Sequence, residues 1–138
     1  MVQRTKHATT NYRMIKPFVD VVDSHDGYRK FKSEGYMDLS MERLYYNDVY
    51  GNPVYSITHY GEQNGDLMAD PDMTFSVTKE GTIIPLSYRN DYIGVAQEVF
   101  VEINGKKMYS QSLLKQLDDF LWMWLKNIQE QGFKPVVA

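Results

Sequence analysis

An apolar stripe near the C-terminus constrains the fold of this chain more than any other feature. Over residues 113–128, apolar side chains recur at about 100° per residue, which is the angular step of an α-helix. They are Leu113, Leu114, Leu117, Phe120, Leu121, Trp124, Leu125 and Ile128. Gly132 follows where a left-handed residue commonly closes a helix. The pattern predicts a long helix that must bury one face against another layer of the protein.

The middle of the chain has the two-residue period of β-strands. In YMDLSMERLYY, residues 36–46, apolar and polar side chains alternate. The segments VYSITHY, MTFSV, IIPLSY and EVFVEI also have strand character and are separated by turn residues. Asn104-Gly105 favours a two-residue hairpin turn, because both turn residues need a positive φ. We therefore expect about six strands, mostly antiparallel, with residues 36–60 as one long hairpin.

A short N-terminal helix is predicted over Asn11–Asp23, where apolar residues again follow helical spacing. Pro17 cannot donate a helical hydrogen bond, so we expect the helix to begin near Lys16. Residues 1–10 hold little that could be buried and are expected to form a flexible arm. Residues 1–138 then form a single α+β domain, in which an antiparallel sheet of about six strands carries both helices on one face.

The composition argues against several classes of function. No run of about 18 apolar residues occurs and the polar N-terminus lacks the apolar core of a secretory signal, so we expect a cytoplasmic protein without a membrane span. The chain has no cysteine, which leaves His, Asp, Glu and main-chain oxygens as metal ligands. A formal net charge of -3 disfavours direct nucleic-acid binding, although YRKFK, residues 28–32, is a local basic patch. Protein partners or small ligands fit this composition better.

The segment HYGEQNGDLMADPDM, residues 59–73, combines a histidine, four carboxylates and two glycines. Asn64-Gly65 predicts a hairpin turn that joins VYSITHY to MTFSV. Counting outward from this turn at a constant register would set a carboxylate opposite Ile57. One extra residue at Asp70-Pro71 instead aligns Ile57 with Met73, so a β-bulge is predicted there.

The same segment has a functional alternative. His59, Asp70 and Asp72 could bind a divalent cation, since His and carboxylates ligate Mg²⁺, Mn²⁺ and Zn²⁺. The spacing matches no calcium-binding loop, and no cofactor is expected. No nucleophile is evident beside His59, so the conformational interpretation of the segment is favoured over a catalytic one.

Three candidate protein-binding surfaces remain. Trp122 and Met123 point away from the apolar stripe and would anchor an interface, unless the N-terminal arm or the tail FKPVV covers them. Tyr46 and Tyr50 belong to the tyrosine-rich hairpin tip YYNDVYGNPVY, and tyrosine is common in binding loops. An acidic edge could occupy a basic nucleic-acid channel of another protein by charge complementarity. Its residues are Tyr60, Glu62, Asp66, Asp70, Asp72 and Asp91.

Four segments resemble a family of small uncharacterised proteins found in bacteria and on their mobile elements. They are GYMDLSMERL, THYGEQNGDLMADPDMTF, RNDYIGVAQEV and FLWMWLKNIQEQGF. The resemblance runs from about Gly35 to Phe133 and centres on an H-Y-x-E-Q-N-G-D-x-x-x-D-P core at His59–Pro71. The family has no assigned activity, so the resemblance implies a genomic setting and no catalytic or binding residues.

Small acidic proteins of mobile elements include inhibitors of CRISPR nucleases and restriction enzymes. The resemblance therefore implies, as a first hypothesis, a non-enzymatic protein-binding module that inhibits a host defence nuclease. One alternative is a metal-dependent enzyme centred on the His59–Asp72 loop. Another is a homo-oligomeric accessory protein, for example a homodimer built on the C-terminal helix. The expected partner is a protein, either a host nuclease or a second copy, with no direct nucleic acid and no membrane.

Overall fold

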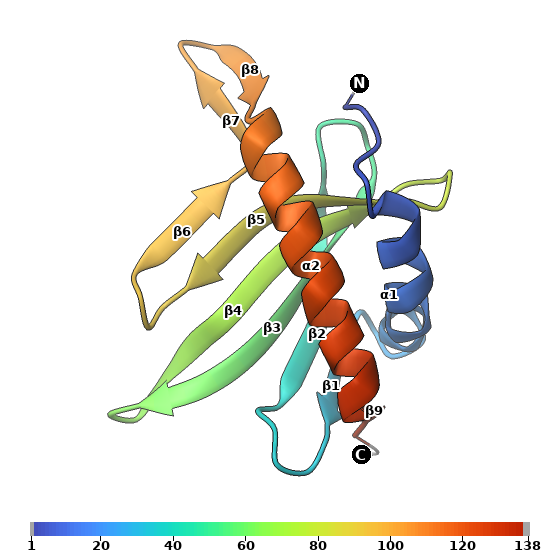
Figure 1. Ribbon diagram of the computed structural model, residues 1–138, viewed down its shortest axis with the longest axis vertical. Helices are drawn as coiled ribbons and strands as arrows, with labels where there is room; N and C mark the ends of the chain where they lie inside the picture. Colours follow the sequence, from blue (N-terminus) through green and yellow to red (C-terminus); the bar gives the residue numbers. More distant parts are fainter. Residues whose placement is uncertain (1, 137–138) are drawn as a thin grey trace.

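Two helices lie on one face of a twisted antiparallel sheet in the computed structural model, which describes residues 2–136 (Figure 1). The helices are α1 (Ala8–Asp23) and α2 (Gln111–Gln131). The strands are β1 (Tyr28–Lys32), β2 (Leu39–Asn47), β3 (Pro53–Gln63), β4 (Asp66–Val77), β5 (Ile83–Asn90), β6 (Val95–Glu98), β7 (Phe100–Ile103), β8 (Lys106–Tyr109) and β9 (Lys134–Pro135). Seven strands form one sheet in the order β6-β5-β4-β3-β2-β1-β9, and β7 and β8 form a second. The predicted α+β class is confirmed.

Helix α2 forms as its apolar stripe predicts. The Ser110 side chain caps it by accepting a hydrogen bond from the Leu113 N–H (3.2 Å), and Gly132 closes it with a φ of 72°. The stripe packs into the hydrophobic core shared with α1 and the sheet. Asp118 is the polar exception on this face, at 1% exposure. Within residues 2–136, no helix is both long and apolar enough to cross a membrane.

Helix α1 begins earlier than the sequence predicts. Its first residue is Ala8, so residues 8–10 are helical and the expected start near Lys16 is wrong. Pro17 lies inside the helix, where its missing N–H leaves the Arg13 carbonyl without a helical donor. Both residues are exposed, so water can hydrate that carbonyl and the helix continues. Met1, the first residue of the expected arm, and Val137, in the tail FKPVV, lie outside the described residues.

The central hairpin, β3–β4, has the predicted geometry. Asn64-Gly65 forms its turn, and both residues have positive φ, 52° and 85°. At Asp70-Pro71, two residues of β4 face one residue of β3, His59, where the register shifts. Beyond this point Ile57 pairs with Met73, and both side chains are buried. The predicted turn and β-bulge are therefore confirmed.

The segment EVFVEI does not form one strand. It divides at Val99, whose N–H donates to the Leu86 carbonyl (2.8 Å), and the chain then leaves the main sheet. β7 pairs with β8 across the predicted Asn104-Gly105 turn, in which both residues have positive φ. A hairpin that projects from the body therefore replaces the single sheet strand that the sequence predicts (Figure 1).

The basic segment YRKFK is strand β1, which the sequence analysis does not predict. Phe31 enters the core with 1% exposure, because alternate side chains of a strand face opposite sides. The ammonium groups of Lys30 and Lys32 lie 3.8 and 3.7 Å from a carboxylate oxygen of Asp38. The local basic patch is thus partly neutralised by its neighbour.

Replacing Gly65 by alanine is expected to destabilise the fold by about 1 kcal/mol, because a side chain disfavours the left-handed backbone of this turn. Chemical denaturation measures the change in the free energy of unfolding. Leu67→Ala is the control, since Leu67 is 71% exposed just beyond the turn. Its effect should stay below about 0.5 kcal/mol. A Gly65→Ala variant as stable as the wild type would contradict the turn geometry.

Candidate functional site

His59 lies in the core and is only 8% exposed. The centre of its ring lies 5.4 Å from that of the Trp124 ring and 5.5 Å from that of the Phe133 ring. Its Nδ1 lies 3.2 Å from the carbonyl oxygen of Asp38. Burial lowers the pKa of His59, because it disfavours the charged imidazolium more than this carbonyl and the Asp70 carboxylate favour it. The imidazole is therefore a packing residue that is neutral at neutral pH.

Asp72 lies on the opposite face of the sheet from His59. It pairs with Thr58, the residue before His59, and the next residue of β4, Met73, is buried in the core. The Thr58 hydroxyl donates a hydrogen bond to its carboxylate (3.0 Å), and a guanidinium nitrogen of Arg89 lies 3.8 Å from the other oxygen. Burial raises the pKa of Asp72, although both contacts favour its charged form. The structure does not bring His59, Asp70 and Asp72 together as one set of metal ligands.

Other acids of the segment also have structural partners. The side-chain amide of Asn90 donates to Asp70 (2.8 Å), and Asp91 accepts the backbone N–H of Ala69 (2.8 Å). These contacts hold the end of β5 against the bulge of β4. The exposed acids of the predicted edge are Glu62 and Asp66, at the tip of the hairpin. The surface available for charge complementarity is therefore smaller than the sequence indicates.

The N-terminal arm covers Trp122. The imidazole of His7 stacks on the indole, with ring centres 4.6 Å apart and planes inclined by 10°. The Lys126 ammonium also lies 4.6 Å from the centre of the indole ring. Trp122 is consequently half-buried, whereas Met123 is 49% exposed. Of the two predicted anchors, Trp122 holds the arm on α2 and Met123 stays accessible.

Tyr46 and Tyr50 are accessible, with 44% and 40% exposure. The N–H of Tyr50 donates to the Asp48 carboxylate (2.9 Å), which fixes the turn between β2 and β3. Its ring and the Phe100 ring form a T-shaped pair, with centres 6.0 Å apart. Partial burial raises the pKa of both tyrosine hydroxyls. Tyr50 therefore joins the tyrosine-rich tip to the base of the β7–β8 hairpin.

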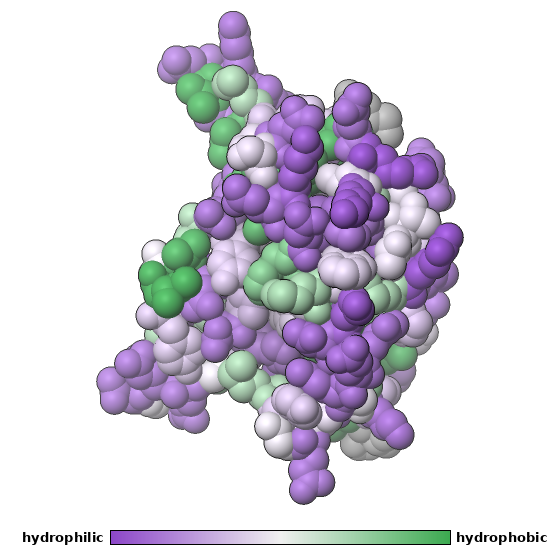
Figure 2. Space-filling view, viewed as in Figure 1, coloured by the Kyte–Doolittle hydropathy of each residue, from purple (hydrophilic) through white to green (hydrophobic). Residues whose placement is uncertain are grey.

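The β7–β8 hairpin carries apolar side chains that the sequence analysis does not single out. Together with the β2–β3 turn it forms what we call the hairpin surface, of residues 40% to 52% exposed. The six residues are Val49, Tyr50, Val101, Ile103, Met108 and Tyr109. Figure 2 shows hydrophobic side chains gathered on this hairpin, at the upper left. A cavity of about 350 Å³ lies between the hairpin and the turn.

A sequence signal for this surface does exist. Only Ser110, the helix cap, separates the end of β8 from α2, so no later strand is close enough to extend the hairpin. Placing EVFVEI in the main sheet hid the signal, because an apolar run alone does not distinguish a buried strand from an exposed one.

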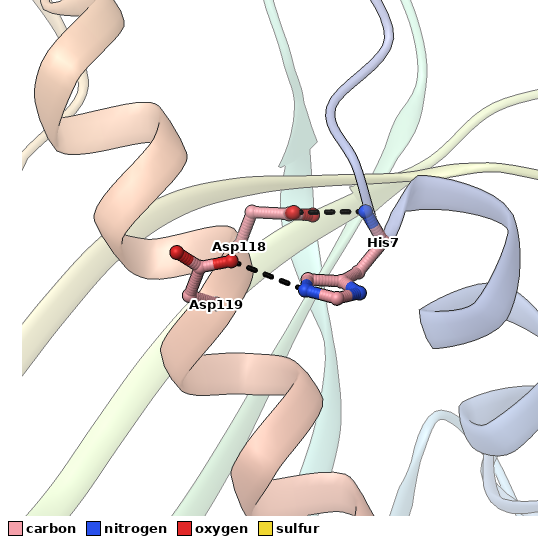
Figure 3. Close-up of side chains that lie close together, drawn as sticks. All are labelled: His7, Asp118 and Asp119. Carbon is pink, nitrogen blue, oxygen red and sulfur yellow. Dashed lines mark hydrogen bonds and ion pairs between the residues drawn. The ribbon is translucent and has the colours of Figure 1, made fainter.

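A second cluster joins the N-terminal arm to α2 and comprises His7, Asp118 and Asp119 (Figure 3). The Nε2 atom of His7 lies 3.1 Å from a carboxylate oxygen of Asp119, and the backbone N–H of His7 donates to a carboxylate oxygen of Asp118 (2.9 Å). The Thr5 hydroxyl donates to the other oxygen of Asp118 (2.6 Å). Asp118 thus caps α1, because His7 provides no side-chain cap of its own. The expectation of a flexible arm is wrong at Thr5 and His7.

The lowered pKa of His59 predicts a specific pH dependence of stability. Between about pH 7.5 and pH 5, the unfolded state binds a proton at His59 near its ordinary pKa of about 6.5, before the folded state does. Stability is then lost as the pH falls, at no more than about 1.4 kcal/mol per pH unit for this group. Denaturation curves of His59→Gln should lack this part of the loss.

His25→Gln is the matched control, because it changes an exposed histidine. It should keep the pH dependence of the wild type. Asp72, whose raised pKa acts in the opposite direction, is present in every variant, so its contribution cancels in the comparison. Parallel pH profiles for wild type and His59→Gln would show that His59 does not titrate differently on folding.

Comparison with known proteins identifies the family. Residues 11–134 match a family described as Domain of unknown function (DUF6908). No curated protein and no solved structure matches the chain significantly. The family match extends over most of the chain, from the first turn of α1 to β9. The chain therefore belongs to this family of uncharacterised proteins.

Proposed function

We propose that the chain is a non-enzymatic protein-binding module and that the hairpin surface is its binding site. One observation carries this proposal: six large apolar residues, each at least 40% exposed, gather around a hairpin that pairs with no other strand in residues 2–136. Exposed apolar side chains that gather on one element of a soluble protein often mark an interaction site. Two of the six are tyrosines, which offer large contact areas at interfaces.

The hairpin presents apolar side chains on both faces. Val101 pairs with Met108, and alternation places Ile103 on the same face, whereas Tyr109 points to the other. An isolated two-stranded hairpin is marginally stable in water, so burial against a partner also stabilises the hairpin itself. Lys106 and Lys107 begin β8 beside the turn. The complementary partner is therefore a protein with an apolar groove bordered by carboxylates.

The partner class that we propose is a host defence nuclease of the CRISPR or restriction type. Two observations support it: the resemblance to proteins of mobile elements, and a surface suited to stoichiometric binding. Inhibition would follow from occupation of a functional groove of the nuclease, without turnover. The metal-dependent enzyme has no comparable support, because His59 is buried and Asp72 lies on the other face of the sheet.

Nuclease inhibition by the purified chain tests the proposal. We expect equimolar inhibition of at least one enzyme in a panel of CRISPR and restriction nucleases. The double variant Val101→Lys/Ile103→Lys should weaken inhibition at least about tenfold, because it places charges in the apolar interface. Its stability should change by less than about 0.5 kcal/mol, since both side chains are exposed. Cleavage assays and thermal unfolding measure the two effects.

Leu67→Lys is the control, since it adds a positive charge at a 71% exposed apolar position on the β3–β4 tip. Inhibition by this control should equal that of the wild type. Failure to inhibit any nuclease of the panel would reject the inhibitor role. A dimer that dissociates in the double variant would instead favour the homo-oligomeric accessory protein.

A further inference from the structure

The His7 cluster, defined as His7, Asp118 and Asp119, has the composition of a metal site. One donor atom from each side chain lies within 4.8 Å of the other two, a geometry that no other group of His, Asp or Glu in residues 2–136 reaches. Its three residues come from the arm and from one turn of α2, as Figure 3 shows. Imidazole and carboxylate together are ligands that Zn²⁺ accepts.

A second observation concerns Asn11, which is fully buried beside the cluster. Its side-chain nitrogen lies 3.4 Å from the main-chain oxygen and 3.5 Å from a carboxylate oxygen of Asp118. The amide oxygen Oδ1 of Asn11 has no hydrogen-bond donor. Buried acceptors are almost always paired, so this oxygen calls for a donor that the protein itself does not supply. A water molecule bound to a metal is such a donor.

The carboxylate of Asp118 is already oriented for ligation. Thr5 and Asn11 donate to one of its oxygens, and the backbone N–H of His7 donates to the other, which keeps a further lone pair. Hydrogen bonds of this kind hold metal-ligating carboxylates in other proteins. The stacking of His7 on Trp122 restricts the imidazole in the same way. Asp119 is 67% exposed, so its side chain can rotate toward a common centre with the other two.

We propose that His7, Asp118 and Asp119 bind one divalent transition-metal ion, with Zn²⁺ as the best match. In a tetrahedral zinc site the donor atoms lie about 3.3–3.5 Å apart. The Nε2 atom of His7 lies 3.1 Å from Asp119, and all three donor atoms lie within 4.8 Å of one another. A water molecule completes the coordination. Mg²⁺ and Ca²⁺ fit less well, because they prefer an all-oxygen shell.

Basic residues nearby limit the affinity. Arg4, Lys6 and Lys115 line an adjoining cavity of about 220 Å³, and their charge opposes that of the ion. We therefore expect zinc to bind with micromolar affinity.

The ion links the arm to α2, so the inference concerns the arm and is independent of the proposed nuclease inhibition. The family match begins at residue 11, so His7 lies outside the region shared with the family, whereas Asp118 and Asp119 lie inside it.

Titration of the full chain with ZnCl₂, after treatment with EDTA and removal of the chelator, tests the site. Isothermal calorimetry should show one ion per chain, and saturating zinc should raise the unfolding midpoint, because the ion binds the folded state. Asp119→Asn keeps the shape of an exposed side chain and should weaken zinc binding at least about tenfold. His7→Gln should have an effect at least as large.

Two variants serve as controls. His25→Gln removes an exposed histidine and Asp66→Asn an exposed carboxylate outside the cluster, and both should bind zinc as the wild type does. Absence of zinc binding, or equal affinity of wild type and Asp119→Asn, would overturn the proposal. A loss of affinity in His25→Gln as large as in His7→Gln would also overturn it, since binding would then be at surface histidines.

Discussion

The register of β3 against β4 is the constraint on which the rest of the structure depends. These strands lie at the centre of the main sheet, and a slip by one residue would turn Met73 and Phe75 away from the helices. The turn at Asn64-Gly65 sets one register and the apolar core requires another. The β-bulge at Asp70-Pro71 takes up the difference of one residue. The acidic residues of this segment are thus positioned by the needs of the backbone.

A buried carboxylate makes the second connection, between elements far apart in the sequence. Asp118 sits on the apolar face of α2 and accepts hydrogen bonds from Thr5 and from the backbone of His7. Isolated, a buried carboxylate would be costly, but three donors and the positive end of α1 compensate. The same contacts allow α1 to begin at Ala8, ahead of Pro17. The docked arm then covers part of Trp122, so this apparent interface residue packs against the arm.

The features that could be predicted from the sequence are those encoded locally. The period of the α2 stripe, the Asn-Gly turns and the bulge follow from neighbouring residues, and the structure confirms each. The start of α1 and the His7 cluster could not be predicted, since Thr5 and Asp118 are 113 positions apart. The hairpin surface was missed for another reason: an apolar strand has the same pattern whether it is buried or exposed. Exposure depends on which neighbours the fold supplies.

The arm and the hairpin surface meet at one end of the molecule. Tyr109 of the hairpin surface lines both the cavity beside the hairpin and the cavity that reaches Asp118 and Asp119. The backbone of Val2 in the arm also acts on the hydroxyl of Tyr50, on the same surface, where it opposes the rise in pKa that burial causes. Contacts that hold the arm on α2 therefore also shape the base of the hairpin surface. The β3–β4 tip lies at the lower left in Figure 1, away from the β7–β8 hairpin and the arm at the top, so a change there leaves this end intact.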